Sequence, residues 1–188
     1  TNNCISRCHF GVKVQVGVDI GCGMYTLKLA DRELDFEKID EACHYIPSGM
    51  NVWEGRKERF DLQQLRCYRE LKDSKRLERS LGTLGGGNHF IEIQQSDSGF
   101  VWLMIHSGSR NLGKRIEEVY QEKAAQLCEK FYTPLPTSDL AFLPIDHRDG
   151  HNYFRDMNFA LKYAFENRQR MMARCKEALA GSVPEVNF

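Results

Sequence analysis

The stretch Leu81-Gly82-Thr83-Leu84-Gly85-Gly86-Gly87-Asn88-His89-Phe90-Ile91-Glu92 connects a charged, helix-like pattern to a strand-like segment through three consecutive glycines. Glycine tolerates positive φ and lets other groups approach the backbone closely. A glycine-rich turn also exposes backbone N–H groups that can hold phosphate or another anion. The stretch therefore predicts an anion cradle with an amide, an imidazole and a carboxylate beside it. Its spacing matches neither the dinucleotide fingerprint nor the P-loop, and a tight turn with a partly buried histidine explains the same residues equally well.

The composition is that of an ordinary globular protein, with 188 residues, 41% hydrophobic and 28% charged. This length is sufficient for one substantial core. The formal net charge of +0 excludes a global basic signal for nucleic acid, so any contact with RNA or DNA has to be local. No apolar run approaches the roughly 20 residues of a membrane-spanning helix.

Seven cysteines are scattered along the chain, and their spacing does not form paired zinc-binding motifs. Most are expected to be reduced thiols packed as small hydrophobic side chains. Together with the lack of a basic-then-apolar signal sequence, these thiols predict cytoplasmic residence, with the nucleus as the alternative.

Cys22 is the exception, because it lies in the turn Asp19-Ile20-Gly21-Cys22-Gly23 between two expected strands at residues 12–18 and 24–30. A carboxylate and a thiol three residues apart on such a turn can converge on one cation. A thiolate is a strong ligand for zinc or another divalent metal and can bridge two ions. A glycine turn with a buried thiol and an aspartate bonded to its own backbone is the structural alternative.

The remaining periodicity predicts helices at residues 35–46, 61–79, 112–131 and 153–179, and a hairpin of strands at 90–94 and 100–105. Residues 1–10 show no periodicity, and residues 133–150 are expected to form a loop. The helix at 61–79 would expose a basic face that is either a phosphate track or, more commonly, a solvated surface. Residues expected on inner helix faces include Phe36, Ile39, Cys43, Leu62, Leu65, Tyr68, Leu71, Leu77, Ile116, Val119, Tyr120, Ala124, Leu127, Cys128, Met157, Leu161, Ala164, Phe165 and Met171.

A third polar strand end is found at His106-Ser107-Gly108-Ser109-Arg110, which precedes a predicted helix. Helix N-termini attract anions, so Arg110 beside the two serines forms a second candidate phosphate site, unless the serines only cap the helix. Three strand ends thus carry Asp19 with Cys22, Asn88 with His89, and His106. Each residue type suits a borderline-soft divalent metal, and together they favour a metal centre.

These segments resemble the RtcB family of RNA-splicing ligases. The resemblance is carried by Val16-Gly17-Val18-Asp19-Ile20-Gly21-Cys22-Gly23-Met24, by the stretch from Leu81 to Glu92, and by His106-Ser107-Gly108-Ser109-Arg110-Asn111-Leu112-Gly113. A helix of the same family is similar to Tyr153-Phe154-Arg155-Asp156-Met157 with Ala160, Tyr163, Ala164, Asn167 and Arg168. The resemblance implies an α+β fold with a mixed β-sheet core and flanking helices, in a single domain over residues 1–188.

The resemblance implies GTP-dependent joining of a 2′,3′-cyclic phosphate or 3′-phosphate RNA end to a 5′-hydroxyl end, with two manganese ions. It implies that Cys22 bridges the metals, that Asp19 and His89 complete the protein ligands of one ion, and that His106 serves the other. Arg110 would hold RNA or nucleotide phosphate. The segment from Asn88 and His89 through Phe90, Ile91 and Glu92 would line the GTP site. The implied partners are RNA, GTP and an archease-like activator, and no membrane association is implied.

Two departures from the family pattern concern the ends of the chain. The family's guanylate-accepting histidine lies in a carboxy-terminal half that would follow Phe188, and an early Asp-x-His-x-Gly-Lys-Gly-like stretch is replaced by Cys8-His9-Phe10-Gly11. We therefore expect a partial chain that binds metal but ligates RNA little or not at all.

Two alternatives use the same residues differently. A metal-dependent phosphoesterase would need no histidine nucleophile, and its turnover of a phosphoester without GTP would distinguish it. A non-catalytic paralogue would bind RNA or a partner protein, and its RNA binding would not depend on metal.

Overall fold

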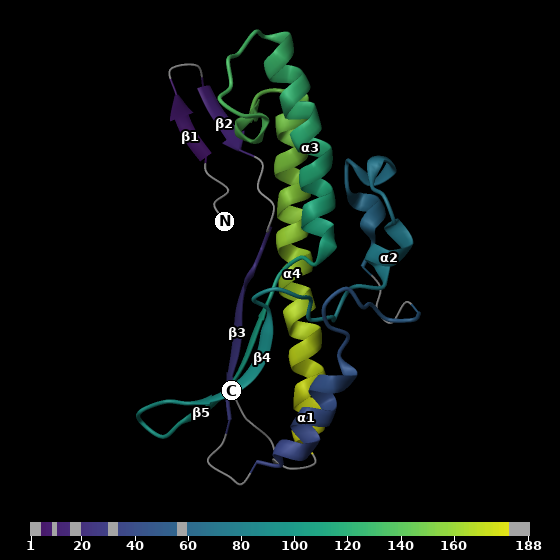
Figure 1. The fold of residues 1–188 in the computed structure, drawn as a ribbon, viewed down its shortest axis with the longest axis vertical. Coiled ribbons are helices and arrows are strands. Elements are labelled where there is room, and N and C mark those ends of the chain that lie inside the picture. The colour runs from purple at the N-terminus through teal and green to yellow at the C-terminus, as the bar shows by residue number, and fades with distance from the viewer. Residues whose placement is uncertain (1–4, 9–10, 16–19, 30–33, 56–59, 181–188) are drawn as a thin grey trace.

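The computed structural model describes residues 5–8, 11–15, 20–29, 34–55 and 60–180. One long helix, α4 (Arg148–Ala180), runs along most of the molecule, as Figure 1 shows. The helix α3 (Asn111–Lys130) lies along the first half of α4, and the helix α1 (Phe36–Tyr45) packs near its end. Because α4 also contacts the strand β5, this helix joins the separate parts of the fold.

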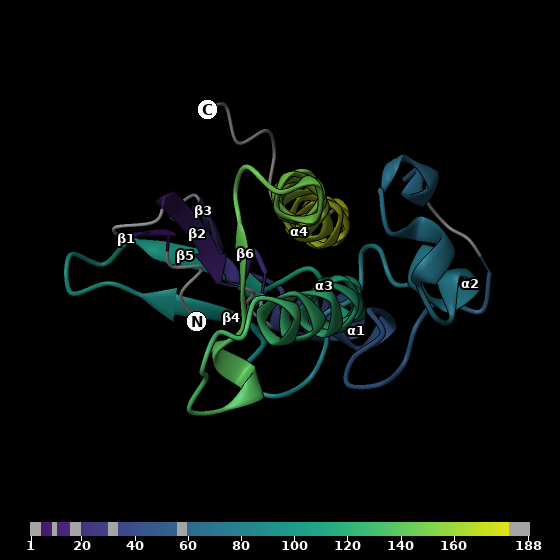
Figure 2. The ribbon, with the colours of Figure 1, turned by 90° about the horizontal axis from the view of Figure 1, so that it is seen from above.

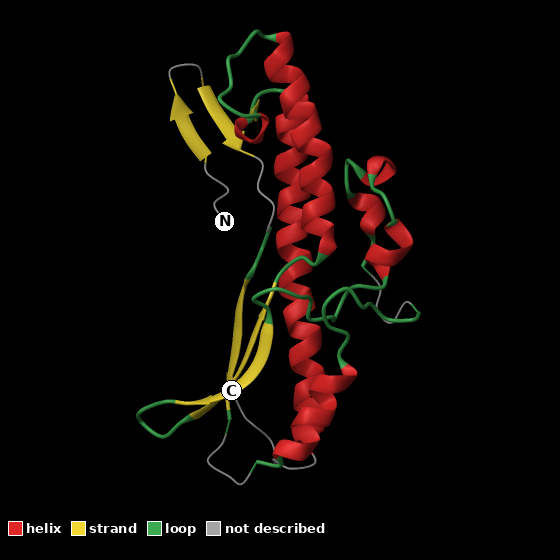
Figure 3. Cartoon of the chain, in the orientation of Figure 1, coloured by secondary structure: helices red, strands yellow, loops and turns green. Residues whose placement is uncertain are grey.

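The strands form two antiparallel sheets of three strands each among the described residues (Figure 3). One sheet has the order β1-β2-β6 and the other β3-β5-β4. The α+β class is confirmed, but the expected single mixed sheet is two antiparallel sheets, because neighbouring strands such as β4 and β5 are joined by a tight hairpin. The strand bounds are Ile5–Cys8 (β1), Gly11–Gln15 (β2), Gly23–Lys28 (β3), Phe90–Gln95 (β4), Val101–Ser107 (β5) and Phe142–Pro144 (β6).

The hairpin between β4 and β5 has the turn that the sequence predicts. Ser96 N–H donates to the Phe100 carbonyl at 2.8 Å, and Gly99 N–H donates to the Ser96 carbonyl at 2.8 Å. Gly99 has a φ of 85°, which glycine adopts without the steric cost of a Cβ atom. The two strands before and after Cys22 are present as β2 and β3, but they belong to different sheets.

Two buried clusters form the core. The first joins α3 to the first half of α4, and its fully buried residues include Ile116, Tyr120 and Tyr153. The second lies between the sheet β3-β5-β4, α1 and the end of α4, around Leu103, Ile105 and Met171. Burial of such large apolar side chains is the main favourable contribution to folding. Since α4 supplies residues to both clusters, this helix connects the two parts of the core.

The predicted helices at residues 35–46, 112–131 and 153–179 are confirmed as α1, α3 and α4. The Asp35 side chain caps α1 by accepting from Lys38 N–H at 3.1 Å. The prediction of an inner position is wrong for three residues, Phe36, Leu161 and Phe165, which are 63%, 39% and 49% exposed. On α4 the other expected inner residues, Met157, Ala164 and Met171, are buried, so the buried face overlaps the expected stripe and excludes only Leu161 and Phe165.

Residues 61–79 do not form the predicted helix. The segment contains the 3₁₀ turns Leu62–Gln64 (η1) and Tyr68–Glu70 (η2) and the short helix α2 (Ser74–Glu78). The Asp156 carboxylate of α4 accepts hydrogen bonds from the backbone N–H groups of Arg66 and Cys67, which a continuous helix would bond internally. The segment lies on the side of the helices opposite the sheets (Figure 2), and its cations do not share one helical face.

Two further expectations are corrected by strand pairing. Residues 5–8, to which the sequence pattern assigns no element, form β1 and pair with β2. The expected loop at 133–150 contains the 3₁₀ turn Ser138–Leu140 (η3) and the strand β6, which pairs with β2. Strands this short are stabilised by their partner rather than by their own pattern. In the part of the chain that the structure describes, no helix has the length and hydropathy needed to cross a membrane.

Candidate metal centre and adjoining pocket

The register of the sheet β3-β5-β4 gathers three predicted ligands at one edge. Gly23 at the start of β3 lies opposite Ser107, and both Met24 and Phe90 lie opposite His106. Because β5 runs antiparallel to both neighbours, its end meets the beginning of β3 and of β4. Cys22 and His89 immediately precede those two strands, so the topology brings them beside His106.

The side chains of these residues converge on the Cys22 sulfur. Cys22 Sγ lies 3.1 Å from His106 Nε2 and 3.6 Å from His89 Nε2. The two imidazole rings meet edge to face, with centroids 5.6 Å apart and planes at 71°. All three side chains are partly buried, so a thiol and two imidazoles share a site that still has access to solvent.

The tautomer of His106 follows from its second hydrogen bond. His106 Nδ1 lies 3.1 Å from the Asn88 carbonyl oxygen, which can only accept, so Nδ1 carries a proton. In the neutral ring, Nε2 then presents its lone pair towards Cys22. A ligating histidine is usually oriented by a backbone carbonyl in this way.

The structure supports this set of donors only in part. Among the described residues, no group of three or more His, Cys, Asp and Glu side chains is arranged to hold a metal ion. Asp19, the predicted fourth ligand, lies outside the described residues. The direct observation is therefore the pair of contacts from Cys22 to His89 and His106.

Asn167 of α4 holds the glycine-rich turn against the end of β5. Its Oδ1 accepts from the Gly82 and Thr83 N–H groups at 2.7 and 3.2 Å. Its Nδ2 donates to the Thr83 carbonyl, the Ser107 hydroxyl and the Gly108 carbonyl at 3.1, 3.1 and 3.3 Å. The amide is fully buried, and it therefore positions both chain segments that carry the histidines.

Arg168 performs the same role for the turn that carries Cys22. Its Nη1 donates to the Gly21 carbonyl at 2.7 Å and to the Ser107 carbonyl at 2.6 Å. Burial lowers the pKa of the Arg168 guanidinium, and nearby Cys22 acts in the opposite direction. A positive charge beside the sulfur favours its thiolate form.

A cavity of about 420 Å³ has His89 in its lining, and we call it the cationic pocket. Its described lining includes Arg76, Arg110 and Lys114 together with Asn88 and His89, and it contains no carboxylate from the described residues. The local charge is thus strongly positive although the chain as a whole is neutral. A pocket with this charge suits an anionic ligand such as a phosphate.

Arg110 is held in place before any ligand binds. Its Nε donates to Thr83 Oγ1 at 2.8 Å and its Nη2 donates to the Gly49 carbonyl at 2.9 Å. Burial lowers the pKa of the Arg110 guanidinium, although an arginine remains charged at neutral pH. Gly85, with φ at +97°, leaves room for the guanidinium, because a Cβ atom there would collide with Arg110 and lie 2.6 Å from His89 Nδ1.

A family model described as tRNA-splicing ligase RtcB matches residues 56–187 of the chain. The chain belongs to the RtcB family. The matched range contains His89, His106 and Arg110, whereas Cys22 lies before it.

Curated members of the RtcB family are similar over most of the chain. The tRNA-splicing ligase RtcB of Archaeoglobus fulgidus is 33% identical over 161 residues, which cover 76% of this chain and 33% of the relative. The RNA-splicing ligase RtcB of Escherichia coli K12 is 30% identical over 191 residues, covering 89% of this chain and 47% of the relative. The tRNA-splicing ligase RtcB of Methanococcus maripaludis is 29% identical, covering 82% and 43%. The chain thus spans between a third and a half of the length of these relatives.

The RtcB resemblance also assigns Phe90, Ile91 and Glu92 to the nucleotide site, and this assignment stays a prediction. Phe90 packs its ring against His106, with centroids 5.3 Å apart. Ile91 packs against the second core cluster, and the Glu92 carboxylate accepts from Gln94 Nε2 at 2.5 Å. Of the five residues expected at the nucleotide site, only Asn88 and His89 line the cationic pocket.

The two serines before α3 lie inside the protein, whereas the phosphate site predicted around Arg110 stays a prediction. Ser107 and Ser109 are buried, and Ser107 Oγ donates to the Leu84 carbonyl at 2.7 Å. Arg110, at the N-cap of α3, makes no side-chain capping bond. The resemblance includes Asn167 and Arg168 but implies no role for them. Two adjacent polar residues on the buried face of α4 are the sequence signal for such positioning contacts.

Proposed function

We propose that this chain forms the metal- and nucleotide-binding part of an RNA ligase. In this proposal the enzyme uses GTP and two manganese ions to join a 2′,3′-cyclic phosphate or 3′-phosphate RNA end to a 5′-hydroxyl end. The family supports an RNA substrate, because its curated members are named RNA- or tRNA-splicing ligases. The observation that carries the proposal is the convergence of Cys22 with His89 and His106 beside the cationic pocket.

Thiolate and imidazole are donor types that bind divalent ions, but the described side chains do not by themselves form a group of three arranged around an ion, so the proposal requires Asp19 to complete the set. Cys22 would bridge as a thiolate, with its charge favoured by Arg168, and His106 would bind through the Nε2 atom that its bond to Asn88 leaves as an acceptor. His89 would bind through Nε2, and Asp19 is proposed as the carboxylate ligand. When bound, the metal ions supply charge neutralisation for phosphates and alignment of the reacting groups.

The cationic pocket would bind and orient the phosphates. Its volume of about 420 Å³ lies within the range of cavities that hold small ligands and cofactors. Arg110, fixed by Thr83 and Gly49, presents a charge that needs little reorganisation when an anion arrives. Arg76 and Lys114 add positive charge from α2 and α3.

Manganese binding to the purified chain tests the metal centre directly. Titration followed by electron paramagnetic resonance should show saturable binding to the native protein. Cys22→Ser and His106→Ala should each weaken binding at least about tenfold, because a lost ligand removes more than about 1.4 kcal/mol. His44→Ala is the matched control, since His44 lies on α1 and is highly exposed.

Nucleotide binding forms the second arm of the test. GTP with manganese should raise the melting temperature of the native chain, and Arg110→Gln should reduce that increase. Equal manganese affinity in the native, Cys22→Ser and His106→Ala proteins would refute the proposed metal centre. If His44→Ala weakened manganese binding as much as His106→Ala, the binding would not be specific to the proposed metal centre.

A further inference from the structure

A second cavity of about 620 Å³ lies between η1 and the first half of α4. We call it the η1–α4 groove. The residues that line it are separate from those of the cationic pocket, and no part of the proposed ligase chemistry uses them. Its size is sufficient for a ligand of one or two nucleotides.

One wall of the η1–α4 groove is aromatic. Phe60, Phe154 and Phe159 line it and are only partly buried. The Phe60 ring packs edge to face against Phe159, with centroids 5.0 Å apart and planes at 73°, and against Tyr163, with centroids 5.2 Å apart. These contacts fix the ring of Phe60. Such fixed rings offer flat surfaces on which a base can stack.

The helix α4, which contributes Phe154 and Phe159, also contributes basic residues at helical spacing to the groove. His151, Arg155 and Lys162 are four and seven residues apart on α4 and line the groove together, as expected for one helical face. Within the described ranges, no ion pair links Arg155 or Lys162 to a carboxylate. Asp61 is the one acidic lining residue described, and it accepts hydrogen bonds from Gln63 N–H and Gln64 Nε2 at 3.1 and 3.4 Å.

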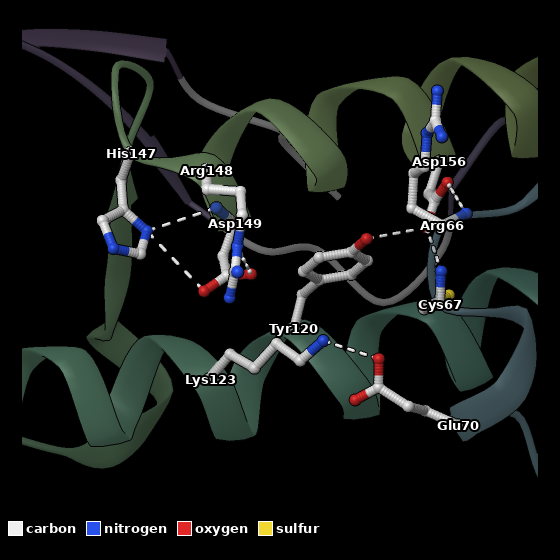
Figure 4. Close-up of polar contacts among 9 residues, drawn as sticks. All are labelled: Arg66, Cys67, Glu70, Tyr120, Lys123, His147, Arg148, Asp149 and Asp156. Carbon is white, nitrogen blue, oxygen red and sulfur yellow. Dashed lines mark hydrogen bonds and ion pairs between the residues drawn. The ribbon is translucent and has the colours of Figure 1, made fainter.

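A buried polar cluster holds the wall formed by η1 against the helices (Figure 4). The Asp156 carboxylate, 1% exposed, accepts from the Arg66 and Cys67 N–H groups at 2.8 and 3.0 Å and from the Tyr120 hydroxyl at 2.7 Å. Burial raises the pKa of both the Tyr120 hydroxyl and the Cys67 thiol, so both remain protonated near neutral pH. The groove is therefore a preformed surface.

We propose that the η1–α4 groove binds single-stranded RNA, with bases stacked on the aromatic wall and phosphates paired with Arg155 and Lys162. This inference rests on the proposed function, because RNA is the substrate that function requires. The segment that contributes Phe60 to the groove also contributes Arg76 to the cationic pocket.

The test measures the binding of a fluorescein-labelled oligouridylate of about ten nucleotides by fluorescence anisotropy, in EDTA and without GTP. The double variant Arg155→Gln/Lys162→Gln should raise Kd at least about tenfold. It should also reduce the slope of log Kd against log salt by about 1.4, since each phosphate contact on a single strand contributes about 0.7. Phe154→Leu should raise Kd about fivefold or more by removing a stacking surface.

The matched control is Lys28→Gln/Lys130→Gln, which removes the same charge from two exposed lysines outside the cavities described. It should leave Kd within about twofold of the native value, and equal melting temperatures should establish that each variant is folded. The inference would be overturned if Arg155→Gln/Lys162→Gln bound the RNA with the same Kd as the native chain, or if the native chain did not bind the RNA. If only Arg110→Gln weakens binding, RNA binds at the cationic pocket alone, and the groove is refuted while the proposed function stands.

Discussion

Replacing Asn167 with alanine should destabilise the chain strongly, because one buried amide makes five hydrogen bonds to the segments that carry the histidines. The change leaves the buried Gly82 and Thr83 N–H groups without their acceptor, at about 1–3 kcal/mol each. The carbonyl and hydroxyl partners lose less, because each can accept from another donor. We expect the free energy of unfolding to fall by about 3–5 kcal/mol.

The assay is urea denaturation followed by far-UV circular dichroism, with the free energy taken from the midpoint and slope. The matched control is Asn158→Ala on the same helix. Asn158 is partly buried, and its Nδ2 donates to the Phe154 carbonyl at 2.7 Å, so the expected cost is about 1 kcal/mol or less. A loss for Asn167→Ala that is no larger than for Asn158→Ala would refute the argument that this amide positions the turn.

Three further predictions concern stability. Burial raises the pKa of Tyr163 from 10.0 to about 12. The neutral hydroxyl therefore contributes about 2–3 kcal/mol of stability, which is fully present below about pH 10 and is lost as pH rises through about 12. Tyr163→Phe should flatten this loss of stability in alkaline denaturation, and an unchanged loss would contradict the prediction. Gly85→Ala should lower the free energy of unfolding in urea by at least about 1–3 kcal/mol, because φ is +97° and the added Cβ would collide with Arg110. The control Gly49→Ala should lower it less, because Gly49 is exposed, with φ at +59° and open space around it. Asp35→Ala should cost about 1 kcal/mol by removing the N-cap of α1, and a change below about 0.3 kcal/mol in thermal unfolding would contradict this.

The elements that the sequence predicts correctly are those with long or repeated local patterns. α3 and α4 are confirmed as helices of 20 and 33 residues, because each presents apolar residues at helical spacing for several turns. α4 begins at Arg148, before the predicted start at Tyr153 and inside the expected loop. The hairpin between β4 and β5 is also predicted, because Ser96 to Gly99 is a typical turn sequence. The segment at residues 61–79 has an equally helical pattern, but Asp156, distant in sequence, binds its backbone and prevents a continuous helix.

For the candidate site, too, one part was predictable from the sequence and the other was decided only by the tertiary structure. The residue types at the strand ends made Cys22, His89 and His106 candidate ligands, since thiols and imidazoles bind borderline-soft divalent metals. Only the tertiary structure decided that these three meet, because the pairing of β3 and β4 with β5 sets which strand ends are neighbours. The tertiary structure also packs the partly buried Ile91 against the second core cluster and places Arg76 and Lys114 in the lining of the cationic pocket. Local sequence determines which chemistry a residue can offer, whereas contacts between segments distant in sequence determine whether it can be used, because a binding site needs several side chains in one place.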